Sequence, residues 1–339
     1  MLKKPDLSDE IIIACLQEEY GLPVVQVDFL PLGADRNTAV YRVVAADGRT
    51  YFLKLRKGVF DETSVALTKF LADQGIEQVI APISTRTGCL WASLESFRLI
   101  LYPFIEGHNG YQVNLSDHHW VTLGMTLKRI HTTVVPPALR GCIRREIYAP
   151  QWRESVKDFL GRLGHNPPED PIAAKLTGFL RAKHEEILDL VGRAERLAAE
   201  LQARFEDFVL CHSDVHAGNL LIATDSALYL VDWDEPILAP KERDLMSVGG
   251  GLMGAGHTLQ EEEALFYRGY SPTSIDPVAL AYYRYERIID DIAVECDCIT
   301  SGKESDDDRR QSLGYLKSNF LPHNTIEIAT GSDRTRKNW

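Results

Sequence analysis

The sequence predicts an α+β fold in two lobes, with strands concentrated in the N-terminal third and helices in most of the remainder. Short apolar runs with period-two alternation, separated by turn residues, occur before residue 104. From residue 116 onward, apolar residues recur mostly at helical spacing. A length of 339 residues with 45% hydrophobic composition is sufficient for two lobes that each bury a core.

The N-terminal region begins with a helix and continues as strands. Ser8 precedes a helical apolar pattern over residues 8–20 and is a suitable N-cap. Asp47-Gly48 predicts a type I′ hairpin turn between two strands. The expected strands cover residues 24–30, 39–45, 49–55 and 97–101, and a helix is expected over 62–73.

The C-terminal region is expected to be mostly helical. Ser116 is a candidate N-cap for a helix over residues 116–133. Further helical patterns cover 150–164, 171–204, 257–270 and 277–300. Residues 301–310 are charged and are expected to form a loop, and the polar tail from Gly331 to Trp339 is expected to fray. We therefore place the first lobe in residues 1–103 and the second in residues 104–339.

Three polar residues beside short strands carry the most specific chemical signal. Asp214, Asn219 and Asp232 are flanked by strands expected over 208–211, 220–222 and 227–231. Phosphoryl transfer needs a carboxylate near the attacking hydroxyl, and an amide oxygen and a second carboxylate for Mg²⁺; protein kinases show the same separations in H-R-D-x-x-x-x-N and D-F-G. We therefore expect Asp214 to be the catalytic base, and Asn219 and Asp232 to bind the metal. The alternative is an ordinary hairpin with polar turn residues.

An upstream strand predicts the nucleotide site. Within Tyr51-Phe52-Leu53-Lys54-Leu55, alternation places Phe52 and Lys54 on the same face. Lys54 would then hold the α- and β-phosphates and Phe52 would cover the adenine, although snorkelling of the lysine to solvent is an alternative. Glu62 could hold Lys54, with Asp61 as the adjacent alternative, or it could serve the dipole of its own helix.

Two loops complete the predicted nucleotide site. The segment Leu32-Gly33-Ala34-Asp35-Arg36-Asn37-Thr38 could lay backbone N–H groups over phosphates, with Gly33 and Asn37 as contacts. It contains one glycine, so a plain β-turn competes with this interpretation. The strand over 97–101 leads into Tyr102-Pro103-Phe104, which suits a hinge whose backbone contacts the adenine edge. Tyr102 and Phe104 are therefore included in the site.

Composition limits the classes of partner. The formal net charge of −12 argues against nucleic-acid binding and is compatible with a cationic small molecule. No apolar run approaches the roughly 20 residues that span a bilayer, and Lys3 and Lys4 precede Pro5 rather than an apolar segment. We expect a cytoplasmic protein with no membrane partner and no signal peptide. The six cysteines predict reduced thiols rather than a zinc site, and we expect a monomer, with a dimer left open.

From the loop at Gly33 to the helix around Glu286, the chain resembles the aminoglycoside phosphotransferase and choline kinase-like group of the protein-kinase-like fold. Within that group the likeness is closer to the spectinomycin phosphotransferases. The segments that carry it are Phe104-Ile105, Arg145-Glu146-Ile147-Tyr148, Cys211 to Asn219, Val231 to Pro236, Ala239 to Met246 and Tyr283 to Ile288.

The resemblance implies how the two lobes are used. It implies an antiparallel-sheet N-lobe that binds nucleotide and a mostly helical C-lobe with the catalytic loop and acceptor pocket. ATP and Mg²⁺ would bind between the lobes. It further implies Asp214 as catalytic base, Asn219 and Asp232 as metal ligands, Lys54 as the phosphate contact and Asp244 as a structural brace of the catalytic loop.

Departures from protein kinases favour a small-molecule kinase. Ser213 replaces the arginine that would pair with an activation-loop phosphate. Trp233 and Asp234 stand in place of the Phe and Gly of D-F-G, and no A-P-E segment follows. These differences argue against a regulated protein kinase.

Acidic residues near the metal aspartate predict a cationic acceptor. Asp234 and Glu235 follow it directly, and Glu286 and Asp290 lie at i,i+4 on one expected helix. Such a like-charge pair costs roughly 0.2–0.5 kcal/mol in isolation, and a cationic ligand would offset this cost. Pairing of Glu286 with Arg284 or Arg243 is an alternative, and Arg287–Asp291 would then be an ordinary surface pair.

The expected function is therefore ATP- and Mg²⁺-dependent transfer of the γ-phosphoryl group to a hydroxyl of an aminocyclitol antibiotic. Spectinomycin is the preferred acceptor, and its phosphorylation would give resistance. Choline, a sugar or another amino alcohol is the alternative acceptor. A non-catalytic kinase-fold binding protein is a further alternative, which the joint presence of Lys54, Asp214, Asn219 and Asp232 disfavours.

Overall fold

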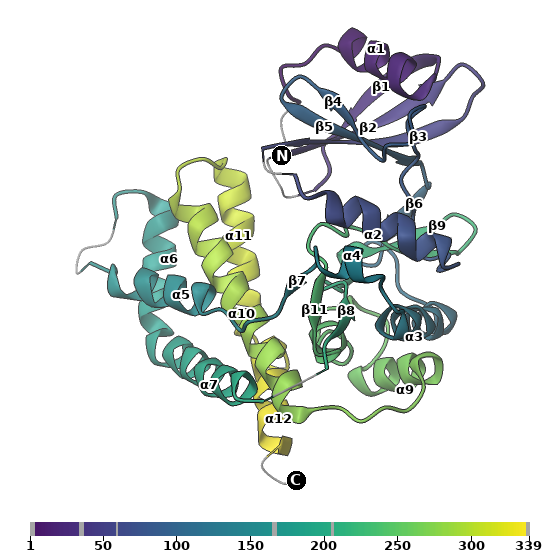
Figure 1. The fold of residues 1–339 in the computed structure, drawn as a ribbon. Helices are drawn as coiled ribbons and strands as arrows, with labels where there is room; N and C mark the ends of the chain where they lie inside the picture. The colour runs from purple at the N-terminus through teal and green to yellow at the C-terminus, as the bar shows by residue number, and fades with distance from the viewer. Residues whose placement is uncertain (1–3, 34–36, 59, 165–167, 205–206, 337–339) are drawn as a thin grey trace. The chain divides into compact units, whose positions relative to one another are not determined.

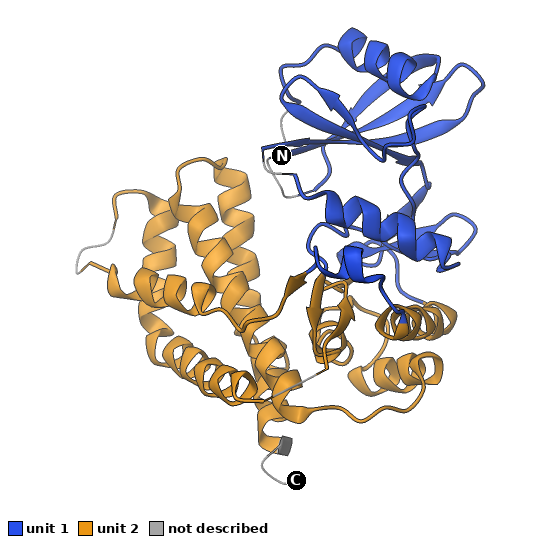
Figure 2. Cartoon of the chain, viewed as in Figure 1, with its two compact units in different colours: residues 1–115, 133–143, 218–236 blue, residues 116–132, 144–217, 237–339 orange. Residues whose placement is uncertain are grey.

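The structure, a computed structural model, describes residues 4–33, 37–58, 60–164, 168–204 and 207–336. The chain divides into two compact units (Figure 2). Unit 1 comprises residues 1–115, 133–143 and 218–236, and unit 2 comprises residues 116–132, 144–217 and 237–339. Most strands belong to unit 1 and most helices to unit 2 (Figure 1), so the predicted α+β fold class is confirmed.

Unit 1 is built on a five-stranded antiparallel sheet with the strand order β1-β2-β3-β5-β4. Its elements are α1 (Asp9–Tyr20), β1 (Val24–Leu30), β2 (Thr38–Ala45), β3 (Thr50–Lys57), α2 (Glu62–Asp73), β4 (Ala92–Leu94), β5 (Phe97–Pro103), β6 (Gly107–Asn109), α4 (Pro137–Arg140), β9 (Leu220–Ala223) and β10 (Leu228–Leu230).

The core of unit 1 lies between helix α1 and this sheet. Ile12 and Leu16 of α1 are fully buried in one cluster with Tyr41 of β2 and with Leu53 and Leu55 of β3. Because strand side chains alternate between faces, the residues between these, including Phe52 and Lys54, lie on the opposite face of β3. The alternation predicted for β3 is confirmed.

The hairpin between β2 and β3 differs from the predicted type I′ turn. Gly48 has a φ of 81°, whereas a type I′ turn needs positive φ at both central residues and Asp47 does not have it. Gly48 N donates to Ala45 O at 2.9 Å, and Ala45 N donates to Arg49 O at 2.9 Å. The connection is therefore a three-residue loop that ends in a left-handed glycine.

A second sheet in unit 1 has the order β10-β9-β6 and is antiparallel throughout. Strand β6 approaches β9 closely at Gly107, where an added Cβ would lie 2.2 Å from Ile222 O. Glycine is therefore required at this crossing. The hairpin β9–β10 confirms the strands that the sequence predicts between Asn219 and Asp232.

Unit 2 is mostly helical and contains a small sheet with the order β7-β11-β8. Its elements are α3 (Asp117–Thr132), β7 (Arg144–Arg145), α5 (Gln151–Gly161), α6 (Pro171–Ala182), α7 (His184–Gln202), β8 (Val209–Cys211), β11 (Ile237–Ala239), α8 (Glu242–Leu245), α9 (Leu259–Tyr270), α10 (Pro277–Thr300), α11 (Asp306–Ser318) and α12 (Thr325–Arg336). Among the described residues, no helix is long and apolar enough to cross a membrane.

Helix α10 forms the centre of unit 2. It packs against α5, α6, α7, α8, α11 and α12, and its buried side chains belong to the large core cluster of this unit. Tyr282, Tyr283 and Tyr285 are almost completely buried there, with the rings of Tyr282 and Tyr148 packed edge to face at 5.3 Å. Polar residues on the same helix are consequently held in fixed positions.

Three secondary-structure predictions for the C-terminal region are wrong: one long helix, one loop and one frayed tail. The pattern over 171–204 forms two helices, α6 and α7, which meet at Lys183, and no glycine or proline marks the break. The charged segment 301–310 contains the start of α11, because Ser305 Oγ accepts from Asp308 N and three aspartates suit the helix N-terminus. The tail continues as α12 to Arg336.

Helices α3 and α9 cross with two glycines at their contact. A Cβ on Gly124 would lie 2.2 Å from Phe266 O, and a Cβ on Gly269 would lie 1.9 Å from Val121 O. The backbones can approach this closely only because both side chains are absent. The crossing positions His131 at the end of α3 and Tyr270 at the end of α9.

Substituting Gly124 with alanine should destabilise the protein by ~1–3 kcal/mol, because the added methyl group forces the two helices apart. Gly178, in the interior of α6, is the matched control, since nothing lies within 4 Å of its Cβ position. Gly178→Ala should stabilise the protein by ~0.5–1 kcal/mol through helix propensity. Urea unfolding of both variants tests this, and a shift of the two midpoints in the same direction would contradict it.

Candidate active site

The two predicted metal ligands lie at the same end of the β9–β10 hairpin. Leu220 pairs with Leu230 in the ladder, and Val231 N donates to Asn219 O at 2.9 Å, so the backbones of residues 219 and 231 are adjacent. Asp232 follows with a φ of 64°, a left-handed conformation that is uncommon for a residue other than glycine. An amide and a carboxylate oxygen at one hairpin end form a donor set that suits Mg²⁺. Their role as metal ligands stays a prediction.

Lys54 is held by the carboxylates that follow the hairpin. Its Nζ lies 2.8 Å from both carboxylate oxygens of Asp234 and 3.3 Å from Oδ1 of Asp232. Arg56 Nη1 contacts Asp234 Oδ2 at 3.1 Å. Asp234 therefore offsets two cations, which leaves less of its charge for an acceptor. Its predicted acceptor contact, and that of the exposed Glu235, stay predictions.

The sequence predicts Glu62 as the partner of Lys54, and the structure shows Asp232 and Asp234 in that position. Glu62 is exposed in the first turn of α2. The adjacent alternative, Asp61, caps this helix by accepting from Thr63 N at 2.9 Å. The hydrogen bonds of Lys54 go to Asp232 and Asp234 rather than to Glu62, and a role of Glu62 in the nucleotide site stays a prediction. The ion pairs of Lys54 with Asp232 and Asp234, which follow the β9–β10 hairpin, were not predicted from the sequence.

Phe52 and Tyr102 lie beside Lys54. They face each other in the β3–β5 register, with ring centroids 6.5 Å apart. Burial and then the charges of Asp234 and Asp232 raise the pKa of Tyr102 above its usual value, which places its hydroxyl in the same neighbourhood. Unit 1 thus gathers an aromatic pair, a lysine and two aspartates, as a nucleotide site requires.

The other predicted nucleotide contacts are less completely defined. Phe104 N donates to Thr50 O at 3.3 Å, and the Arg42 guanidinium lies 5.4 Å from the Phe104 ring. Gly33 has a φ of 94°, and Asn37 O accepts from Lys57 N at 2.7 Å. Residues 34–36, between them, lie outside the described residues. The roles of Gly33, Asn37 and Phe104 stay predictions.

In unit 2, Asp214 is held by two basic side chains. Arg287 Nη1 donates to Asp214 Oδ1 at 2.5 Å, and His216 Nε2 lies 3.4 Å from Asp214 Oδ2. Burial alone would raise the pKa of the Asp214 carboxyl, but the His216 hydrogen bond and the Arg287 charge bring it well below its usual range. Asp214 is therefore ionised at neutral pH, as its predicted role requires.

Glu286 and Asp290 form a largely buried acidic pair on α10. Burial raises the pKa of Glu286 to about 7 and that of Asp290 to about 6, against the partial opposition of nearby arginines. Glu286 pairs with Arg153 at 3.6 Å rather than with the predicted Arg284 or Arg243, and Glu286 Oε2 and Asp290 Oδ1 accept no hydrogen bond. Two carboxylate oxygens are thus buried and unsatisfied, which is costly unless a ligand binds them.

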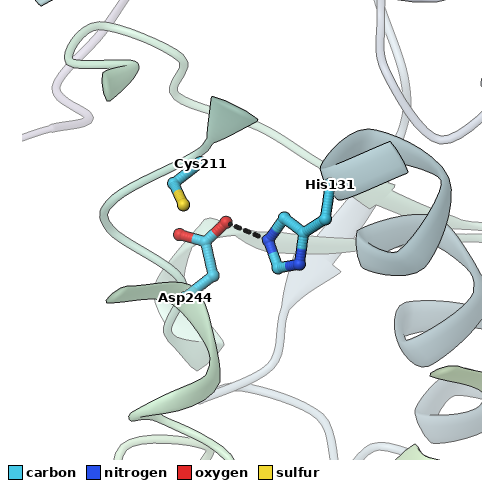
Figure 3. A group of neighbouring side chains, drawn as sticks. All are labelled: His131, Cys211 and Asp244. Carbon is cyan, nitrogen blue, oxygen red and sulfur yellow. Dashed lines mark hydrogen bonds and ion pairs between the residues drawn. The ribbon is translucent and has the colours of Figure 1, made fainter. Parts of the chain in front are cut away.

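The loop before Asp214 is braced by a buried network (Figure 3). Asp244 is fully buried and accepts from the backbone N–H groups of His212 at 2.9 Å and Ser213 at 2.7 Å. His131 Nε2 contacts the same carboxylate at 3.0 Å, and its Nδ1 contacts Tyr270 Oη at 2.8 Å. These contacts support the brace that the resemblance implies for Asp244.

The side chains of His131, Cys211 and Asp244 could in principle hold a metal ion, since their ligand atoms lie within 4.8 Å of one another. Both nitrogens of His131 and both oxygens of Asp244 already have partners within the protein. Burial also raises the pKa of the Cys211 thiol well above its usual value, which disfavours the thiolate that a metal needs. The group therefore acts as a structural brace.

Comparison with known proteins identifies the family. Residues 28–264 match the phosphotransferase enzyme family. The chain belongs to this family. It is an enzyme, a phosphotransferase that acts on hydroxyl groups.

Solved structures of similar proteins agree with the family. A spectinomycin phosphotransferase crystallised with ADP and spectinomycin is 37% identical, over 98% of this chain and 100% of that chain, with a TM-score of 0.90. Its AMP-bound complex matches at 36% identity over 96% and 98% of the two chains, with a TM-score of 0.84. An aminoglycoside phosphotransferase from Alicyclobacillus acidocaldarius, 14% identical over 99% and 98% with a TM-score of 0.66, shares the fold. The predicted protein-kinase-like fold is confirmed.

Several site residues were missed by sequence reasoning. Arg287 and Asp291 were interpreted as an alternative surface pair, yet Arg287 also binds Asp214. His216 lies two positions after Asp214, and Arg153 reaches Glu286 from another helix. The helical spacing of Arg287 and Asp291 was visible, but the loop contact of Arg287 depends on tertiary packing.

Asp244→Asn should destabilise this phosphotransferase by ~3–5 kcal/mol. The amide has one acceptor oxygen and an NH2 group in place of the other, so one of the present contacts with His131 and the two backbone N–H groups is lost, together with the negative charge. Tyr270→Phe is the control at the edge of the network and should cost ~1 kcal/mol, since it removes one hydroxyl. Urea unfolding at pH 7 measures both. Equal midpoints for the two variants would contradict the assigned brace.

Proposed function

We propose that this enzyme transfers the γ-phosphoryl group of ATP, with Mg²⁺, to a hydroxyl of spectinomycin. The observation that carries this proposal is the buried, unsatisfied acidic pair Glu286 and Asp290 in the unit that also contains Asp214. The similarity to a spectinomycin phosphotransferase over almost the whole chain supports the same acceptor. Resistance through modification of the antibiotic in the cytoplasm is the corresponding cellular role.

Residues of unit 1 would bind the nucleotide. Lys54 supplies a positive charge for the phosphates, and its pairing with Asp232 and Asp234 keeps it in place before ATP binds. Phe52 and Tyr102 provide an aromatic surface for the adenine. Asn219 and Asp232 would hold Mg²⁺, which, when bound, neutralises negative charge on the phosphates.

Asp214 would orient the attacking hydroxyl. An ionised aspartate is too weak a base to remove a proton from an alcohol before the reaction begins. In a loose transition state it positions the nucleophile and accepts the proton late. The low pKa of Asp214 fits this role, since the carboxylate must be available as an acceptor whenever a substrate binds.

The acidic pair would bind the amino groups of the acceptor. An ammonium group placed against Glu286 Oε2 and Asp290 Oδ1 would satisfy both oxygens and favour their ionised forms. A sugar without an amino group could donate hydroxyl hydrogen bonds to these oxygens but would bring no positive charge. The site therefore favours a cationic aminocyclitol over a neutral sugar.

Acceptor-stimulated release of ADP, measured over spectinomycin, other aminoglycosides, choline and neutral sugars, should be highest with spectinomycin. Asp214→Ala should lower kcat by ~10²–10⁴, the range expected for loss of an acid–base group. Glu18→Ala, a substitution at an exposed position of α1, should leave turnover unchanged. Absence of turnover with every aminocyclitol would reject the proposed acceptor, and full activity in Asp214→Ala would reject the mechanism.

The KM for the cationic acceptor should fall about tenfold from pH 6 to pH 8, because each pH unit below a controlling pKa weakens binding tenfold. The sign follows from the raised pKa of Glu286, about 7, and of Asp290, about 6: both are more protonated at pH 6 and bind a cation less well.

Glu286→Gln should raise KM at pH 8 and reduce its pH dependence. The KM for ATP, measured in parallel, is the internal control and should not follow this trend. A KM for spectinomycin that is constant from pH 6 to pH 8 in the unsubstituted enzyme would rule out binding to this pair.

A further inference from the structure

Helix α10 carries a basic residue that contacts the predicted catalytic base. Arg287 is a quarter exposed, and its guanidinium bridges two carboxylates. Nε donates to Asp291 Oδ1 at 3.0 Å, one turn along the same helix, and Nη1 donates to Asp214 Oδ1 at 2.5 Å. The loop with Asp214 is thus tied directly to the central helix of unit 2.

The charges around Asp214 show why such a contact matters. Burial and the charge of Asp214 raise the pKa values of Asp290 and Asp291 on α10, and the charge of Arg287 lowers both. Burial raises the pKa of Asp214 itself, whereas the His216 hydrogen bond and the Arg287 charge lower it. A cation among these three carboxylates therefore favours their ionised forms.

We propose that Arg287 is a positioning residue for phosphoryl transfer, which holds the carboxylate of Asp214 ionised and oriented toward the acceptor hydroxyl. The proposal rests on the proposed function of Asp214. Arginine suits the task because its guanidinium stays charged and presents its N–H donors in a fixed fork, so one side chain serves Asp291 and Asp214 together. Oδ2 of Asp214 faces His216 Nε2 at 3.4 Å.

The two carboxylate oxygens of Asp214 contact different side chains. Arg287 fixes Oδ1, which sets the rotation of the carboxyl group about its Cβ–Cγ bond. His216 Nε2, 3.4 Å from Oδ2, limits the remaining movement. A carboxylate fixed at both oxygens presents its remaining lone pairs in defined directions, which a loosely held aspartate would do only part of the time.

The test compares Arg287→Met with Arg193→Met. Arg193 is a matched control: its side chain is also a quarter exposed, and it also pairs with an aspartate one helical turn away, Asp189, and with a distant one, Asp333. It contacts no residue of the proposed site among these partners. The readout is kcat at saturating acceptor, because Glu286 and Asp290 titrate in the same pH range and affect binding.

We expect kcat of the unsubstituted enzyme and of Arg193→Met to be flat from pH 5.5 to 8. When kcat is followed down to pH 4, the acidic limb of Arg287→Met should lie at least one pH unit higher than that of the unsubstituted enzyme. Arg287→Lys, which keeps the charge, should return the limb most of the way to lower pH. A kcat that Arg287→Met lowers by the same factor at every pH, or a limb of equal size in Arg193→Met, would overturn the proposal.

A second measurement does not depend on the acceptor. In the Arg287-containing protein, Asp214→Asn should lower the urea midpoint at pH 7, because it leaves Arg287 without a charged partner. In Arg287→Met the same substitution should have a clearly smaller effect on the midpoint, because the contact between the two side chains is already lost. Additive effects would overturn the proposal. Absence of turnover with spectinomycin would instead overturn only the proposed acceptor, since this cycle can still be measured.

Discussion

The buried carboxylate of Asp244 is the contact on which the loop before Asp214 depends. Its two oxygens accept from consecutive backbone N–H groups, those of His212 and Ser213, and so fix the chain direction just before Asp214. Ser213 has a φ of 78°, a conformation that costs free energy for a residue with a side chain. A charged acceptor with no exposure to solvent can maintain that conformation because its hydrogen bonds are strong in a low-dielectric interior.

In each unit a charged side chain that is partly removed from solvent is paired with side chains of opposite charge. In unit 1 Lys54 would be costly to hold beside an apolar sheet, and Asp234 and Asp232 stabilise it. In unit 2 burial would raise the pKa of Asp214, and the His216 hydrogen bond and the charge of Arg287 bring it below its usual range. Glu286 and Asp290 differ, since their pKa values remain raised toward neutrality. Lys54 and Asp214 thus have preformed partners of opposite charge, whereas Glu286 Oε2 and Asp290 Oδ1 accept no hydrogen bond.

Most helices and strands could be predicted from the local sequence pattern. Most of the missed features are contacts between residues far apart in the sequence. Period-two alternation located β3 and the faces of Lys54 and Phe52, because alternation is a property of the strand itself. The helices on either side of Lys183 and the helix over 325–336 all pack against α10, and no glycine or proline marks the break at Lys183. The partners of Lys54 and Asp214 lie 178–180 and 73 residues away, and one sequence gives no direct information on such contacts.

Two residues of the segment from His212 to Asp234 have a left-handed backbone conformation. Ser213 and Asp232 both have positive φ, and they lie next to Asp214 and Trp233 in the sequence. At Asp232 the reversal follows β10 directly, and Trp233 is buried next to it with its Nε1 donating to Leu230 O at 3.0 Å. That anchor compensates for the strain, so a buried tryptophan can occupy a position where protein kinases use a mobile Phe-Gly pair. The substitution thereby favours one fixed conformation over a switch.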